Sequence, residues 1–309
     1  MKHVKVYLPI AVAALLLAGV SGCGGGATDV PTITVKPAEE AASPSTDVTP
    51  TNGAKTPGVV EPPPTTGGFG TFMGRVVIKG GGVESRPALV LKGKAALDPA
   101  VCAATADIPD QSLLVSADGG LANVFVFLKK APKNGKDSLG TEAEVLLLDQ
   151  QGCIFEPHAM VVRTGTPITV KNSDSKPHNV KTKPALGQPY DKSLNQNQTG
   201  ELVYDRPEPV PVGVECNFHT WMRAYQLPLD HPYGVITKAD GSFEIPNLPV
   251  GTHQFVIWHE RSTRSLFSRF KVKIKSDGDV VKETIEVEAA KLTDVGGAKT
   301  KTIKLSLNR

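Results

Sequence analysis

Short segments of alternating apolar and polar residues run through the chain from about residue 68 to its end. This period of two is typical of β-strands with one buried face, and the Gly, Pro, Asn and Asp between the segments favour turns. No long stretch keeps the helical period. The folded part is therefore predicted to be all-β, with one large or two ordinary β-sandwiches. Clear examples of the alternation are GRVVIKG, NVFVFLK, PITVKNSD, HQFVIWHE and TIKLSLNR.

Residues 1–22 have the layout of a secretory signal. A positive start with Lys2 and Lys5 precedes an apolar run that is too short to be assigned as a membrane span. The ending VSGC resembles a bacterial lipobox, which implies that Cys23 is lipidated and begins the mature chain. An unlipidated signal peptide is the alternative. We expect an exported protein, anchored by lipid to a bacterial membrane on the periplasmic or cell-surface side. Cys23 is not followed by Asp, and in this respect the chain resembles outer-membrane lipoproteins.

Cys23 and the residues up to 67 are predicted to form a tether. The segment is rich in Pro, Thr, Ala and Gly and has almost no large apolar side chains, so it cannot bury enough surface to offset its ordering entropy. Removal of residues 1–22 takes away two lysines and lowers the formal net charge from +3 to +1. A nearly neutral protein has no electrostatic reason to bind nucleic acid, which is therefore not an expected partner.

Three cysteines remain after Cys23, and an odd number in an exported protein leaves one thiol unpaired. The economical assignment pairs Cys102 with Cys153 across a long loop and leaves Cys216 free. A metal ion would explain a free thiol in an oxidising compartment. The alternative is that Cys216 is simply buried.

The heptapeptide CNFHTWM places Cys216, His219 and Met222 at even spacing. One thiolate, two imidazoles and a distant thioether are the ligands of a blue-copper site, because the soft thioether leaves neither oxidation state strongly preferred. The second imidazole has to come from elsewhere in the chain. His178 is the candidate, since it follows the strand-and-turn segment PITVKNSDSKP. Ordinary core packing of the same three residues is the alternative.

The segments ITVKNSDSKPHNV and VECNFHTWM together resemble the cupredoxin family, and the ligand loop resembles the amicyanin type. The resemblance implies one type 1 copper ion held by His178, Cys216, His219 and Met222. It also implies that Asn179 ties the two ligand loops together near the sulfur of Cys216. Over about residues 70–275 the chain is similar to exported cupredoxin-like proteins of the methylamine-utilisation-like branch. Trp221 inside the ligand loop, and the long chain after it, depart from a small cupredoxin.

The other histidines are predicted to have structural roles. His158 follows Cys153 closely and is expected near the site, as a hydrogen-bonding partner or as an alternative metal ligand. His231, His253 and His259 fall in the C-terminal β segment, where structural or surface roles are favoured. No ordered Ser/His/Asp set and no paired carboxylates stand out in the folded part, so the protein is not expected to be an enzyme.

The segment TKADGSFEIPNLPVGTHQFVIW resembles the carboxypeptidase regulatory-like, or transthyretin-like, β-sandwich. The simpler domain reading is a Greek-key cupredoxin-like sandwich over 68–230, a regulatory-like segment over 231–290 and a C-terminal strand or tail over 291–309. In the alternative, residues 68–130 and 231–287 form one sandwich and the copper segment, about 141–230, is inserted into it.

The sequence predicts a membrane-anchored mononuclear copper protein that transfers single electrons to an unidentified redox partner protein. Two alternatives remain open. One is a non-catalytic β-sandwich lipoprotein that recognises carbohydrate or protein and has a vestigial metal site. The other is copper storage or delivery through the same ligands. The proposed Asn179 link favours electron transfer, since a rigid site suits it better than metal release.

Overall fold

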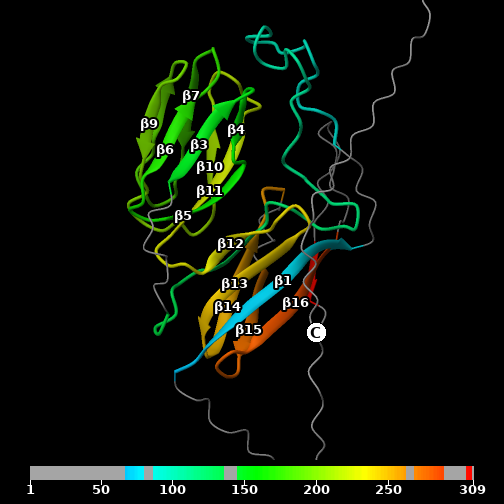
Figure 1. Ribbon diagram of the computed structural model, residues 1–309, viewed down its shortest axis with the longest axis vertical. Helices are drawn as coiled ribbons and strands as arrows, with labels where there is room; N and C mark the ends of the chain where they lie inside the picture. The colour runs from blue at the N-terminus through cyan, green and yellow to red at the C-terminus, as the bar shows by residue number, and fades with distance from the viewer. Residues whose placement is uncertain (1–66, 80–85, 136–144, 262–267, 289–303, 308–309) are drawn as a thin grey trace, which may run out of the picture. The chain divides into compact units, whose positions relative to one another are not determined.

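The computed structural model of the protein describes residues 67–79, 86–135, 145–261, 268–288 and 304–307 (Figure 1). These residues form strands, turns and irregular segments and contain no α-helix, so the all-β prediction is confirmed for them. None of the described residues belongs to a helix long and apolar enough to cross a membrane. The predicted signal peptide, the lipidation site Cys23 and the tether lie outside the described residues.

One β-sandwich is built from residues 146–229 and appears in green and yellow-green in Figure 1. A five-stranded sheet has the order β5-β11-β10-β7-β8, and a four-stranded sheet has the order β4-β3-β6-β9. The strands are β3 (Leu146–Gln151), β4 (Ile154–Glu156), β5 (Ala159–Arg163), β6 (Ile168–Asn172), β7 (His178–Thr182), β8 (Asp191–Leu194), β9 (Thr199–Leu202), β10 (Val212–Glu215) and β11 (Arg223–Leu229).

The core of this first sandwich follows from the alternation in its strands. In β6, for example, Ile168, Val170 and Asn172 are buried while the residues between them are partly exposed. Val180 of β7 and Val214 of β10 are fully buried in the same cluster. Two of the predicted metal ligands, Cys216 and Met222, belong to this core too.

A second β-sandwich has one sheet in the order β13-β1-β16-β17 and another in the order β12-β2-β14-β15. Its core is rich in phenylalanine: the ring of Phe72 lies 4.9 Å from that of Phe255 and 5.1 Å from that of Phe243, between centroids. The strands are β1 (Phe69–Lys79), β2 (Phe125–Leu128), β12 (Gly234–Ile236), β13 (Ser242–Pro249), β14 (Gly251–Trp258), β15 (Ser268–Ile274), β16 (Val280–Glu288) and β17 (Lys304–Leu307).

The pairing of these strands follows the nested arrangement and not two consecutive domains. β1 lies between β13 and β16, and β2 lies between β12 and β14, so each sheet needs a strand from before residue 130 in its interior. A boundary at residue 230 would leave both sheets divided, with unpaired backbone groups in their middle. The first sandwich is thus an insertion between β2 and β12. These two strands pair directly with each other.

A tight turn between β12 and β13 lies over the N-terminal strand. Gly241 has a φ of +82°, and a Cβ at this position would lie 2.3 Å from the carbonyl oxygen of Val76. The N–H of Val76 in turn donates to the carbonyl of Gly241 at 2.9 Å. Only glycine combines this conformation with so close a backbone approach, which explains the Asp-Gly pair in the sequence.

Residues from both sandwiches meet in a third apolar cluster. Phe125 and Phe127 of β2 and Val256 of β14 pack there with Leu227 and Leu229 of β11. Consistent with this, the described residues of both sandwiches fall within one compact unit.

Candidate metal centre

Two neighbouring strands bring the predicted donors together. β7 and β10 run antiparallel, with Glu215 opposite Lys181, so the start of β7 and the end of β10 lie at the same edge of the sheet. His178 is the first residue of β7, Cys216 follows the last residue of β10, and His219 lies in the turn that leads to β11. The strand pairing therefore makes neighbours of residues about forty positions apart.

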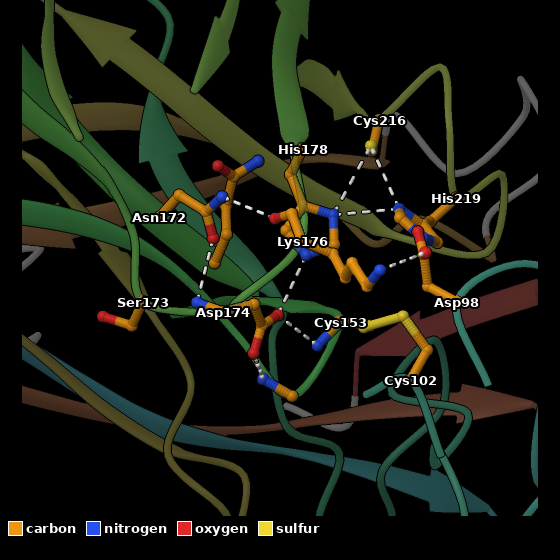
Figure 2. A network of polar contacts seen from close by, with 12 residues as sticks. Asp98, Cys102, Cys153, Asn172, Ser173, Asp174, Lys176, His178, Cys216 and His219 are labelled. Carbon is orange, nitrogen blue, oxygen red and sulfur yellow. Dashed lines mark hydrogen bonds and ion pairs between the residues drawn. A yellow bond between two sulfur atoms is a disulfide. The ribbon is translucent and has the colours of Figure 1, made fainter. Parts of the chain in front are cut away.

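The three donors form a compact, buried triangle (Figure 2). Nδ1 of His178 lies 2.9 Å from Nδ1 of His219, and Sγ of Cys216 lies 4.0 Å and 3.9 Å from these two nitrogens. The two histidines are 0% exposed and the cysteine 3%. A point equidistant from the three atoms lies about 2.1 Å from each, which is close to ordinary metal–nitrogen and metal–sulfur bond lengths.

The first histidine is oriented by a carboxylate. Nε2 of His178 lies 2.9 Å from Oδ2 of Asp174, whose two oxygens also accept hydrogen bonds from the backbone N–H groups of Gly152 and Cys153 at 2.7 and 2.8 Å. A carboxylate only accepts, so the proton of the neutral ring sits on Nε2 and the Nδ1 lone pair is free for a metal. Asp174 was not among the predicted site residues, although its position four residues before His178 is a local signal.

The second histidine has a carboxylate of its own. Nε2 of His219 lies 3.2 Å from Oδ2 of Asp98, and the other oxygen of Asp98 lies 3.5 Å from Nζ of Lys176. Asp98 lies in the irregular connection between β1 and β2 and has a φ of +51°. Both candidate ligand rings therefore present Nδ1 to the same point and Nε2 to a carboxylate, as Figure 2 shows. Asp98 was not among the predicted site residues either, and no local sequence pattern marks it.

The sulfur of Cys216 accepts backbone hydrogen bonds. The N–H of Asn179 lies 3.5 Å from Sγ. Burial raises the pKa of the Cys216 thiol, but the contact with His178 and the backbone N–H groups around the sulfur outweigh it, so that the pKa is lowered. Asn179 also accepts the backbone N–H of Asn217 through its side-chain oxygen. Asn179 thus joins the loops that carry the first histidine and the cysteine.

The two histidines differ in their affinity for a proton. Burial lowers the pKa of His178, whereas the contacts with Asp174 and Cys216 raise it, and the result is a pKa of about 9. Burial and the charge of His178 lower the pKa of His219, and Asp98 opposes this shift. The metal-free centre therefore holds a proton between the two Nδ1 atoms, with His178 as the donor. A metal ion would replace this proton.

Met222 closes the ligand loop. Its N–H donates to the carbonyl of His219 at 2.9 Å, and its carbonyl accepts the N–H of Cys216 at 3.3 Å. The side chain is 1% exposed and belongs to the same core cluster as Cys216. These two backbone hydrogen bonds hold Cys216, His219 and Met222 in one tight turn.

A disulfide lies beside the triangle. Cys102 and Cys153 are joined, and their sulfurs and a ring nitrogen of His219 all lie within 4.8 Å of one another. Trp221 packs its ring at 5.2 Å from that of His219, between centroids, and its Nε1 donates to the carbonyl of Cys153 at 3.1 Å. The bulky ring in the ligand loop is therefore one wall of the site.

His158 does not join the three donors. Its Nε2 lies 2.5 Å from Oε1 of Glu260, which follows β14 of the second sandwich. The groups that could hold a metal among the described residues do not include His158. His231, His253 and His259 are buried in other surroundings, and Nε2 of His253 donates to the carbonyl of Pro249 at 2.6 Å.

The donor set fits a soft or borderline metal ion. One thiolate and two imidazole nitrogens can hold a metal here, and carboxylates already orient both rings. Hard cations such as Mg²⁺ or Ca²⁺ prefer oxygen ligands, and neither carboxylate points to the centre of the triangle because each is engaged by an Nε2.

No known protein family matches the chain, and no curated protein does. Solved structures that resemble part of the chain include cupredoxins. A purple cupredoxin from Nitrosopumilus maritimus is 20% identical over 27% of this chain and 99% of its own, with a TM-score of 0.24. A reduced amicyanin mutant is 19% identical over 34% and 91%, with a TM-score of 0.25.

A copper-containing nitrite reductase from Thermus scotoductus SA-01 is 16% identical over 30% of this chain and 24% of its own, with a TM-score of 0.26. Likenesses this weak do not assign the chain to a family. The proposals that follow rest on the residues of the site itself.

Proposed function

We propose that the protein binds one copper ion in the triangle of His178, Cys216 and His219 and carries single electrons. The observation that supports this most directly is the buried convergence of one sulfur and two Nδ1 atoms on one point. Copper would supply a one-electron change of oxidation state there. The weak fourth ligand would be the thioether of Met222, whose backbone is already bonded to both neighbouring donors.

Electron transfer suits the surroundings of the donors better than catalysis or copper release. The three donors are at most 3% exposed, so a substrate has no direct access to the metal position. Asp174 and Asp98 hold the two rings, and Asn179 ties the loops. Ligands that are fixed in advance change little between oxidation states, and they hinder the loss of the metal.

We also propose that the protein is exported from the cytoplasm. The signal-like residues 1–22 and the lipobox-like Cys23 support export and a lipid anchor, with the outer membrane favoured. A tether of about forty residues would let the folded part reach a redox partner protein. The disulfide between Cys102 and Cys153 is in keeping with an oxidising compartment.

A visible absorption titration of the purified full-length protein with Cu(II) tests the proposal. We expect an intense thiolate-to-copper band that saturates at one copper per chain and bleaches with ascorbate. The Cys216→Ala variant should lose the band and keep its disulfide and its fold. Loose, colourless copper binding in the native protein, or a band that survives in Cys216→Ala, would contradict the assignment.

A further inference from the structure

A cavity lies next to the candidate metal centre, and its lining includes none of the three donors His178, Cys216 and His219. Its volume is about 770 Å³, which is within the range of pockets that bind small molecules. Its walls come from four parts of the chain: the β1–β2 connection, β4 with the turn that follows it, the ligand loop with β11, and the residues after β14. Its charged and aromatic lining residues include Arg86, Asp110, Trp221, Tyr225, Glu260 and Arg261.

Two arginines share one carboxylate in this cavity. Nε of Arg86 lies 2.6 Å from Oδ2 of Asp110, and Nη2 of Arg261 lies 3.1 Å from the same oxygen, while Nε of Arg261 donates to the hydroxyl of Ser112. The side chains of Arg86, Asp110 and Arg261 are only 9%, 4% and 19% exposed. A guanidinium has five N–H donors, and these contacts, together with one from Nη2 of Arg261 to the hydroxyl of Ser112, occupy only part of the donors of the two arginines. One carboxylate cannot neutralise two largely buried cations.

The remaining charges do not remove this excess. The cavity is lined by three arginines and two carboxylates, which gives its walls a formal charge of +1 when His158 is neutral. The third arginine, Arg223, is exposed. The charge of the second carboxylate, Glu260, is already included in this sum, and its Oε1 lies 2.5 Å from Nε2 of His158. Burial and the charge of Arg86 lower the pKa of Arg261, and the charges of Asp110 and Glu260 oppose this shift without cancelling it. A bound anion would supply the missing counter-charge.

Aromatic side chains line the same cavity. Trp221 and Tyr225 both contribute to its walls, and Tyr225 is backed by the ring of Trp258 at 5.0 Å. Burial raises the pKa of Tyr225, so its phenol stays neutral. Flat aromatic walls favour a flat aromatic occupant, because offset stacking and edge-to-face contacts add to the burial of apolar area.

We propose that this cavity binds a small aromatic carboxylate, with its ring against Trp221 and Tyr225 and its carboxylate held by Arg261 and Arg86. Planar guanidinium groups match the two oxygens of a carboxylate better than a single ammonium does. Binding does not require the metal. An occupant in contact with Trp221 is separated from His219 by one side chain.

Calorimetric titration of the full-length protein with 4-hydroxybenzoate tests the binding, first without metal and then after loading with Cu(II). We expect saturable one-to-one binding in both forms. Phenol, hexanoate and inorganic phosphate should each bind at least tenfold more weakly, because each lacks the ring, the carboxylate or both. Arg261→Gln should weaken 4-hydroxybenzoate binding tenfold or more. Arg206→Gln removes an exposed arginine from another loop and should leave the affinity unchanged.

A spectroscopic signal of the native protein also decides the question, should Arg261→Gln fold poorly. The indole N–H resonance of Trp221, assigned by its absence in Trp221→Phe, should shift on addition of 4-hydroxybenzoate and saturate with the calorimetric affinity. The proposal is overturned by no saturable binding at millimolar ligand, by equal affinity for phenol or hexanoate, or by unchanged affinity in a folded Arg261→Gln variant. Binding without metal but no thiolate band with copper would retain this proposal and reject the proposed function.

Discussion

Nε2 of His219 lies 3.2 Å from Oδ2 of Asp98, a residue 121 positions earlier in the chain. The aspartate belongs to the connection that leads from β1 to β2 of the second sandwich, whereas the histidine belongs to the inserted sandwich. The candidate centre is therefore completed from outside the sheets that carry its donors. The disulfide, four residues after Asp98, fastens the same connection to the inserted sandwich.

Asp98→Asn should raise the reduction potential of the copper-loaded protein. The carboxylate makes His219 a stronger donor by polarising its Nε2–H, and this favours the more electron-poor Cu(II). Loss of such a partner typically costs 10–100-fold in metal affinity, which corresponds to roughly 60–120 mV if Cu(II) alone is affected. Cyclic voltammetry measures the change. Asp205→Asn, at an exposed carboxylate, is the control, and an unchanged potential in Asp98→Asn would show that the contact is only structural.

Met222→Leu tests the fourth ligand. Leucine keeps most of the volume, so the fold should lose less than about 1.5 kcal/mol. The thiolate band should persist with altered intensity, and the reduction potential should rise by roughly 60 mV or more, since loss of a weak donor disfavours Cu(II). Met160→Leu is a matched control, because Met160 lies in the same core cluster. Equal potentials in the two variants would show that Met222 is an ordinary core residue.

Removal of the disulfide should destabilise the fold around the candidate centre. The bond closes a loop with a sequence separation of 51, and such a cross-link stabilises a protein by about 2–4 kcal/mol, chiefly through the unfolded chain. We expect the Cys102→Ala, Cys153→Ala double variant to lose about this much in urea unfolding. Treatment of the native protein with a reductant should give the same loss. A double variant as stable as the native protein would contradict the prediction.

The sequence could predict the meeting of His178, Cys216 and His219 because each lies at a strand end within one chain segment. The alternation of apolar and polar residues locates the strands, and the antiparallel pairing of β7 with β10 brings the ends that carry these residues together. Asp174 could have been found by its spacing to His178. Asp98 could not, because its position depends on an irregular connection and on how that connection crosses another sandwich. The nesting could be stated only as an alternative, since alternation locates strands but does not determine which strands pair.

Titration of His259 should set part of the pH dependence of stability. Burial lowers the pKa of His259 to about 4, and its Nδ1 accepts the backbone N–H of Arg261 at 3.4 Å. The unfolded chain binds this proton near its ordinary pKa of about 6.5. Stability is therefore lost as the pH falls below about 6.5, and the loss is complete below about 4.

His259→Gln removes this titration. The shift corresponds to roughly 3 kcal/mol, so the native protein should lose about that much more stability than the variant between pH 7 and pH 4. Urea unfolding at a series of pH values measures both curves. The nearby charged groups Glu260, His158 and Arg261 are common to both proteins and cancel in the comparison. Parallel curves would show that His259 is already protonated in the native state or remains neutral in both states.

The nested topology predicts that residues 231–309 do not fold alone. They lack β1 and β2, which lie inside both sheets of the second sandwich. The two ends of the insertion lie close together, because the N–H of Leu128, before it, donates to the carbonyl of Tyr233, after it, at 2.9 Å. A chain that joins residues 67–129 to 232–309 through a short turn should therefore fold and unfold cooperatively on heating, as followed by circular dichroism.

Phe125 and Phe127 should be replaced by Thr in that joined chain, because their rings pack against Leu227 and Leu229 of the insertion and would otherwise be uncovered. The fragment 231–309 is the matched comparison and should show no cooperative transition. A folded fragment would mean that β13 and β16, or β12 and β14, can pair without the strand that separates them here, and the consecutive domain boundary at residue 230 would then hold.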